Sequence, residues 1–103
     1  MTQALRKAVR VIVQVAKPQK IILFGSRALG SNTPQSDYDL LVLKRGLKKT
    51  RALAQKIYLN FKNIGAPIDV IVVDLKTYEQ FKEDPYFIYR EAAQHGQVIY
   101  EKA

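Results

Sequence analysis

Two aspartates, Asp37 and Asp39, stand one residue apart at the start of an apolar run, and this pair constrains the chain more than any other feature. The run that follows, Leu40 to Leu43, is typical of a buried strand. Because side chains alternate between the two faces of a strand, both carboxylates are expected on the same face. Like charges on one face repel each other unless a cation lies between them. The pair therefore indicates a site for a divalent cation with oxygen ligands.

A glycine turn precedes the aspartate pair. A short apolar run, Ile21 to Phe24, leads into Gly25 and Ser26. Glycine allows a phosphate to approach the backbone closely, and the amides at a helix start can hydrogen-bond to it together with the Ser26 hydroxyl. A tight turn chosen for its backbone geometry explains this feature equally well on its own. Gly25 and Gly30 have the spacing of a P-loop, but Ser31-Asn32 replaces its Lys-Ser/Thr pair, which excludes that motif.

A third carboxylate, Asp69, lies inside a β-branched run from Ile68 to Val73. A lone carboxylate is costly to bury unless it is paired or bound to a metal. Taken alone, Asp37 could cap the preceding loop and Asp69 could form a salt bridge. Together, and downstream of a Gly-Ser turn, Asp37, Asp39 and Asp69 favour a site for two Mg²⁺ ions roughly 3.5–4 Å apart.

Helical and strand patterns alternate along the chain. The spacing of apolar residues predicts helices over Thr2 to Ala16, Ser26 to Leu29, about Leu47 to Ile64, Lys76 to Lys82, and Pro85 to about His95. Strands are predicted at Lys20 to Phe24, Asp37 to Leu43, Ile68 to Val73 and, as an edge strand, Val98 to Tyr100. This order predicts the α/β or α+β class, with a small mixed sheet of three to four strands covered by helices. A length of 103 residues suits a single domain spanning 1–103.

Two helix boundaries are predicted from particular residues. In the helix from about Leu47, the inward face comprises Leu53, Ile57, Phe61 and Ile64. Gly65 suits the position just after the end of that helix, and Asp74 suits an N-cap for the next one.

Composition narrows the classes of partner and location. Seventeen Lys and Arg against nine Asp and Glu give a net charge of +8, which favours an anionic partner. The absence of cysteine excludes disulfides and thiolate metal sites. No apolar run is long enough to span a bilayer, and the N-terminus lacks the apolar core of a signal peptide, so we expect a cytoplasmic domain.

The Gly-Ser turn, the Asp-x-Asp pair about ten residues later and the third Asp on a later strand resemble the DNA polymerase β-like nucleotidyltransferase superfamily. The small size resembles the minimal nucleotidyltransferases, the MNT or MntA-type antitoxins that are paired with HEPN ribonuclease toxins. The resemblance extends over nearly the whole chain. The chain departs from it at Leu29, where many relatives have arginine, and this leaves Arg27 as the nearest cation.

The resemblance implies a function and a set of site residues. ATP is expected to bind with its triphosphate near Gly25 and Ser26, with Arg27 and Ser36 as further nucleotide-binding candidates. Asp37 and Asp39 are expected to hold two Mg²⁺ ions, and Asp69 to help hold one of them and to activate the attacking hydroxyl. AMP is then transferred to a tyrosine of the cognate HEPN toxin, which silences the toxin.

Two other functions stay open at this level. The chain could be an antitoxin that neutralises its partner by binding alone, without catalysis. It could also be an RNA-directed nucleotidyltransferase, although 103 residues leave little surface for a long substrate; direct binding of nucleic acid is thus disfavoured without being excluded.

Overall fold

The computed structural model describes all residues from 1 to 103, arranged around a four-stranded sheet. The helices are α1 (Gln3–Ala16), α2 (Ser26–Leu29), α3 (Thr50–Asn60), α4 (Leu75–Phe81) and α5 (Ile88–His95). The strands are β1 (Lys20–Phe24), β2 (Tyr38–Lys44), β3 (Ile68–Asp74) and β4 (Gln97–Glu101). The predicted strands all exist, and the mixed α/β class is confirmed.

The sheet has the strand order β3-β2-β1-β4 and is mixed. β1 pairs antiparallel with both β2 and β4, whereas β2 and β3 run parallel and are joined through α3. The two ends of the order are occupied by β3 and β4, so the last strand is an edge strand, as the sequence predicted. The parallel pairing matters most for the site, because it brings equivalent positions of β2 and β3 side by side.

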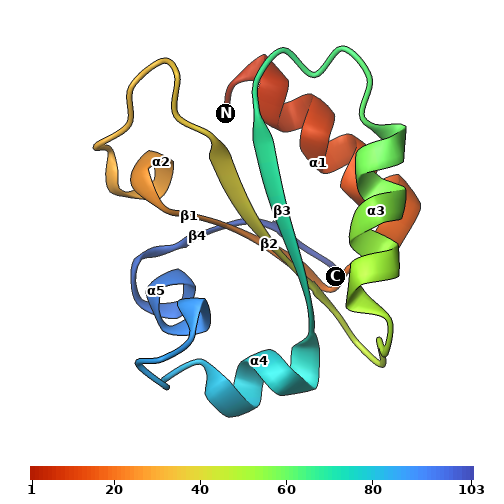
Figure 1. The fold of residues 1–103 in the computed structure, drawn as a ribbon, viewed down its shortest axis with the longest axis vertical. Coiled ribbons are helices and arrows are strands. Elements are labelled where there is room, and N and C mark those ends of the chain that lie inside the picture. The colour runs from red at the N-terminus through yellow and green to blue at the C-terminus, as the bar shows by residue number, and fades with distance from the viewer.

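Each face of the sheet has its own hydrophobic core. On one face, α1 and α3 pack against alternate residues of β1 and β2 through a cluster that includes Ala8, Ile12, Ile57 and Leu40. On the other face, α4 and α5 cover a second cluster, which comprises Ile22, Phe24, Leu41, Leu43, Val73, Tyr78 and Ala92. Figure 1 shows α1 and α3 on one side of the strands and α4 and α5 on the other. No helix is both long and apolar enough to cross a membrane.

The first helix begins and ends where its sequence predicts. The Thr2 hydroxyl accepts a hydrogen bond from the Leu5 amide at 3.3 Å, which caps α1. Lys17 adopts a left-handed conformation at the C-terminal end (φ 48°), and buried Pro18 follows before β1. Buried residues recur along one side of α1, so the charged side chains are left on the opposite side.

The third helix is shorter than predicted at both ends. At its start, the Leu47 amide donates to Asp74 Oδ1 at 2.9 Å, which holds residue 47 outside the helix. At its end, Phe61 is extended (ψ 122°) and Asn63 has a positive φ of 54°. The prediction that Gly65 follows the helix end is therefore wrong, because α3 ends at Asn60. The predicted inward face is confirmed, since Ile57 is buried and Leu53, Phe61 and Ile64 pack against the same core.

The helix predicted from Pro85 begins three residues later, at Ile88. A turn occupies the intervening residues: the Tyr86 amide donates to Asp84 Oδ1 at 2.9 Å, and the Phe87 amide donates to the Asp84 carbonyl at 3.2 Å. Gly96 ends α5 as predicted, with its amide bonded to the Ala92 carbonyl. Asp74 precedes α4 as predicted, but its carboxylate bonds to Leu47 and makes no capping bond.

Candidate active site

The strand alternation places Asp39 and Asp69 on the face of the sheet that α4 and α5 cover, whereas Asp37, predicted to open the strand, lies one residue before β2. Tyr38 and Leu40 point into the core under α1 and α3, and Leu41 points to the other side. Asp39 shares the side of Leu41 because the two are separated by one residue, Leu40, along β2. In the parallel pair, Asp39 lies directly opposite Asp69. Two carboxylates from different strands, far apart in sequence, are thus neighbours in the sheet.

Electrostatic repulsion is concentrated on Asp39. Burial raises the pKa of its carboxyl above the ordinary value of 3.8, and the charges of Asp69, Asp37 and Glu91 raise it further. No basic side chain offsets this, because the two ion pairs in the structure, Lys20–Glu101 and Lys82–Glu79, lie elsewhere. A half-buried carboxylate among other carboxylates, without a cationic partner, is a common feature of sites that bind a cation or handle protons.

The donor set suits a hard divalent cation, although the side chains do not converge on a single point. Carboxylate oxygens are the ligands that Mg²⁺ and similar ions prefer, and a cation would relieve the repulsion at Asp39. In this structure no three acidic or histidine side chains lie close enough together to hold one ion. The register therefore pairs Asp39 with Asp69 and does not include Asp37, and the predicted meeting of the three side chains at one point is not observed. None of the four surface pockets is lined by Asp37, Asp39 or Asp69.

Gly25 joins the turn after β1 directly to Asp39. It adopts a left-handed φ of 74°, and its carbonyl accepts hydrogen bonds from the amides of Ala28 and Leu29 at 3.1 and 3.2 Å. A Cβ atom at this position would overlap the Asp39 carboxylate. Both the backbone conformation and the space therefore require glycine here. Ser26, the first residue of α2, follows at once, so the turn and the Asp39 carboxylate lie side by side.

The structure places Arg27 on the opposite face of the sheet from the aspartates. Its guanidinium lies 4.0 Å from the centre of the Tyr38 ring, and Tyr38 belongs to the core under α1. Its Nε and Nη2 donate to the Ser36 carbonyl at 3.1 and 3.0 Å. The Ser36 hydroxyl accepts from the Thr33 amide at 2.9 Å. Arg27 and Ser36 thus brace the loop between α2 and β2, and neither points at the carboxylates in this arrangement.

Two residues near the site carry no signal in the sequence. The Tyr58 hydroxyl, from α3, accepts a short hydrogen bond of 2.6 Å from the Val70 amide and reaches Asp69 Oδ1 at 3.4 Å. Burial, and to a lesser extent the charge of Asp69, raises the pKa of Tyr58, while the Val70 bond lowers it. Glu91, from α5, is close enough to raise the pKa of Asp39. Both depend on helices packing across the sheet, which no local spacing reveals.

Comparison with known proteins places this geometry in context. The chain matches the family model described as a nucleotidyltransferase domain over residues 3–99. A crystal structure of a toxin-antitoxin with AMP-PNP is 22% identical, with a TM-score of 0.60, and the match covers 94% of this chain and 73% of that one. A candidate nucleotidyltransferase from Sulfolobus solfataricus is 19% identical, with a TM-score of 0.60, and the match covers 99% and 90%.

A mutant of the toxin-antitoxin MntA-HpeT is similar to the same degree: 19% identity, a TM-score of 0.60, and coverage of 99% of this chain and 75% of that one. The search of curated proteins found no match. At these identities the solved structures establish the shared fold, while the family model covers nearly the whole chain.

Proposed function

The chain belongs to the nucleotidyltransferase domain family, and from this premise we propose that it transfers AMP from ATP to a protein, acting as an antitoxin. The observation that carries the proposal is the register of the parallel strands, which sets Asp39 opposite Asp69, beside the turn at Gly25. Carboxylates from two strands next to a glycine turn provide oxygen ligands and an open backbone at the same place. Nucleotidyl transfer to a hydroxyl uses both.

Each site residue has a role in this proposal. Asp37 and Asp39 would hold Mg²⁺, which when bound neutralises the charge of the triphosphate. Gly25 and Ser26 bind the triphosphate through their backbone and hydroxyl groups. Asp69 accepts the proton of the attacking hydroxyl. The hydroxyl oxygen bonds to the α-phosphorus as the bond from that phosphorus to the bridging oxygen breaks, and pyrophosphate leaves.

The acceptor that we propose is a tyrosine of a cognate HEPN ribonuclease toxin. The similar structures support the kind of ligand and partner, since one is a toxin-antitoxin with AMP-PNP and another is the toxin-antitoxin MntA-HpeT. Modification of the toxin would silence it. Chemistry of this type relies on positioning and charge neutralisation, so the loss of one metal-binding carboxylate is expected to remove most of the activity.

The test is transfer of an α-phosphate label from ATP to a HEPN protein encoded beside the gene, with and without Mg²⁺. Asp39→Ala and Asp37→Ala should each lower the rate by about 10²-fold or more. Glu83→Ala is the matched control, because Glu83 is an exposed carboxylate that makes no hydrogen bond or ion pair in the structure. Normal labelling by both aspartate variants would refute the assignment of the active site.

A second function, neutralisation by binding alone, is favoured by one specific surface. Tyr86, Phe87 and Ile88 are 92%, 44% and 40% exposed and line a hollow of about 450 Å³ at the start of α5. Exposed aromatic and aliphatic side chains of this kind commonly anchor a protein partner. If Asp37→Asn abolished labelling and left neutralisation of the toxin intact, binding would be the mechanism.

A further inference from the structure

Charge is unevenly distributed between the two layers of helices. The segments 1–36 and 40–68 contain no Asp or Glu, so α1, α3 and their flanking loops carry only positive charges. On the other side of the sheet, α4, α5 and the turn between them combine acidic and basic residues: Lys76, Glu79, Lys82, Glu83, Asp84, Arg90 and Glu91. The net charge of +8 is therefore concentrated on the layer formed by α1 and α3.

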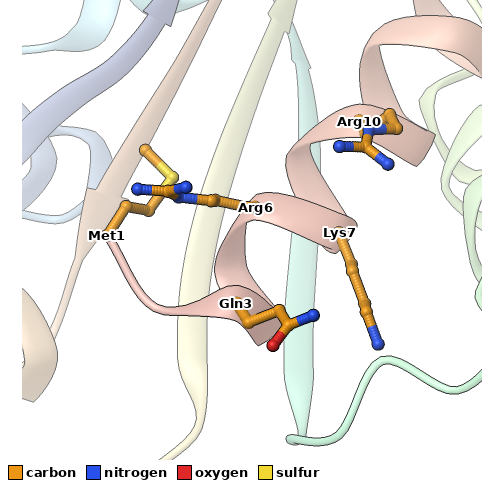
Figure 2. Close-up of a pocket in the computed structure, with 5 residues that line it drawn as sticks. All are labelled: Met1, Gln3, Arg6, Lys7 and Arg10. Carbon is orange, nitrogen blue, oxygen red and sulfur yellow. The ribbon is translucent and has the colours of Figure 1, made fainter.

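One cationic part of that layer is a hollow on α1, which we name the α1 basic surface. Its lining comprises Met1, Gln3, Arg6, Lys7 and Arg10, and its volume is about 450 Å³. Figure 2 shows the three cationic side chains projecting from the helix, with Arg6 directed toward Met1. Arg6 and Arg10 are separated by four residues, about 6 Å along the helix axis. Two guanidinium groups one turn apart can contact successive anionic groups of a polymer.

None of these cations is neutralised within the chain. Neither of the two ion pairs in the structure involves α1. Lys7 Nζ donates to the Asn63 carbonyl at 3.2 Å, which fixes the ammonium group and leaves its charge uncompensated. The backbone beneath is held in place, because Leu5, Ala8 and Ile12 of the same helix are buried in the core. The cations are thus displayed on a rigid helix.

The chemistry of the surface favours phosphate over a protein partner. A protein interface usually has an apolar and aromatic centre, whereas contacts to a nucleic-acid backbone are made mainly by Arg, Lys and amide side chains. The α1 basic surface has one apolar residue, Met1, and no aromatic one. The exposed aromatic residues Tyr86 and Phe87 precede α5, in the other layer. Arginine also pairs with phosphate in a bidentate manner.

We propose that the α1 basic surface binds the phosphodiester backbone of a nucleic acid. The contacts are to phosphates, so the binding is independent of base sequence. The surface lies on the opposite side of the sheet from Asp39 and Asp69, so the bound polymer is not the acceptor of the transferred AMP. This binding activity does not depend on the proposed transferase function.

The test measures binding of fluorescently labelled RNA and DNA oligonucleotides, single- and double-stranded, to the full chain by anisotropy over a range of KCl concentrations. The wild type should show a steep fall of affinity with salt, because each phosphate contact releases counterions. The double variant Arg6→Gln/Arg10→Gln should bind on the order of tenfold more weakly, and its log–log salt slope should be smaller by roughly 1.4 to 1.8. Arg6→Lys/Arg10→Lys should keep the slope of the wild type.

The matched control is Lys76→Gln/Lys102→Gln, which removes the same charge from two exposed positions outside α1. It should bind like the wild type; an equal loss in both double variants would show that net charge alone is responsible, and would overturn the proposal. Competition by poly-L-glutamate as strong, charge for charge, as that by the oligonucleotide would also overturn the proposal, because an acidic protein would then be the better ligand.

Asp39→Asn should bind the oligonucleotides normally, which separates this test from that of the transferase. Comparison of the RNA and DNA probes identifies which polymer is preferred.

Discussion

Each face of the sheet carries charge that is not neutralised within the chain: acidic at Asp39 on one face and basic on α1 at the other. The two charges differ in how much they destabilise the folded state. On the face that α4 and α5 cover, Asp39 is half-buried and repelled by three other carboxylates. On the face that α1 and α3 cover, the cations of α1 extend from the helix, and Arg6 and Arg10 are exposed to solvent. Water screens the exposed charges and reaches the half-buried carboxylate less well.

The difference separates two kinds of site. A half-buried carboxylate that destabilises the folded state indicates a position kept for chemistry, because a neutral residue there would serve folding better. Exposed arginines cost the fold little, so their arrangement indicates binding without catalysis. Variants that change one face at a time should therefore differ in activity, in stability and in their response to pH and salt.

Apart from the aspartate variants, the largest effect is expected from Gly25→Ala, which acts on the carboxylate face. A side chain there is strained by the φ of 74° and overlaps the Asp39 carboxylate. A displacement of that carboxylate by about 1 Å should lower the transfer rate by roughly 10²-fold, because catalysis depends on the position of the reacting groups. The backbone strain should cost about 1–3 kcal/mol of stability. Initial rates of label transfer and urea denaturation measure the two effects.

Gly46→Ala is the control for this variant. Gly46 also has a left-handed conformation, with φ 73°, but nothing lies within 4 Å of its Cβ position. It should lose similar stability and keep its transfer rate. Equal losses of activity in the two variants would mean that Gly25 acts through global stability, and that its contact with Asp39 is irrelevant to the chemistry.

The strand positions of the aspartates could be predicted from the sequence because they depend on local patterns of residues. Alternation along a strand is enough to choose the face of Asp39, and the apolar run around Asp69 is enough to make it a strand residue, whereas Asp37 was predicted in the same strand and lies one residue before it. The family resemblance implied that Gly25 binds the triphosphate and that Asp39 binds metal, whereas the contact between the two residues comes from the structure. The strands themselves were predicted to within about two residues.

What escaped prediction depends on contacts between distant parts of the chain. The Leu47 amide bonds to Asp74, twenty-seven residues away, so periodicity placed the start of α3 too early. Arg27 follows the glycine turn in sequence, yet the attraction of the Tyr38 ring and the Ser36 carbonyl takes its guanidinium to the other face. Tyr58 reaches Asp69 only because α3 packs beside the edge strand β3.

The next largest effect is stabilisation by Mg²⁺, which acts on the carboxylate face and should not involve the cationic one. A ligand that binds only the folded state adds about 2.7 kcal/mol at 100 times its dissociation constant. The melting temperature of the wild type should therefore rise with Mg²⁺ at constant ionic strength. The double variant Asp37→Asn/Asp39→Asn should not respond, and Arg6→Gln/Arg10→Gln should respond fully. A rise of equal size in the aspartate variant would place the ion elsewhere.

Asp39→Asn should stabilise the protein at neutral pH in the absence of divalent cations. The pKa of Asp39 in the folded state is raised above 3.8, so the folded state binds the proton more tightly than the unfolded one. The stability of the wild type therefore falls as the pH rises from 3.8 through the raised pKa, and the penalty is complete above it. The variant lacks this penalty, so the melting temperatures should differ by a few degrees at pH 7 and converge at acidic pH. Urea denaturation at several pH values checks this, and a difference that grew toward low pH would contradict it.

The smallest change in stability is expected from variants of the cationic face. This change should depend more strongly on salt than the stabilisation by Asp39→Asn. Arg6 and Arg10 are like charges at positions i and i+4 of α1, an arrangement that costs roughly 0.2–0.5 kcal/mol. Arg6→Gln/Arg10→Gln should therefore be slightly more stable than the wild type at low ionic strength. Because both side chains are exposed, the gain should vanish at 1 M NaCl, where the Debye length is about 3 Å. The gain from Asp39→Asn should persist there in part, because burial is the largest cause of its raised pKa and salt does not screen burial. If 1 M NaCl abolished the stabilisation by Asp39→Asn as completely as that by Arg6→Gln/Arg10→Gln, burial would not contribute to the penalty at Asp39. The proposed difference between the two faces would then be wrong.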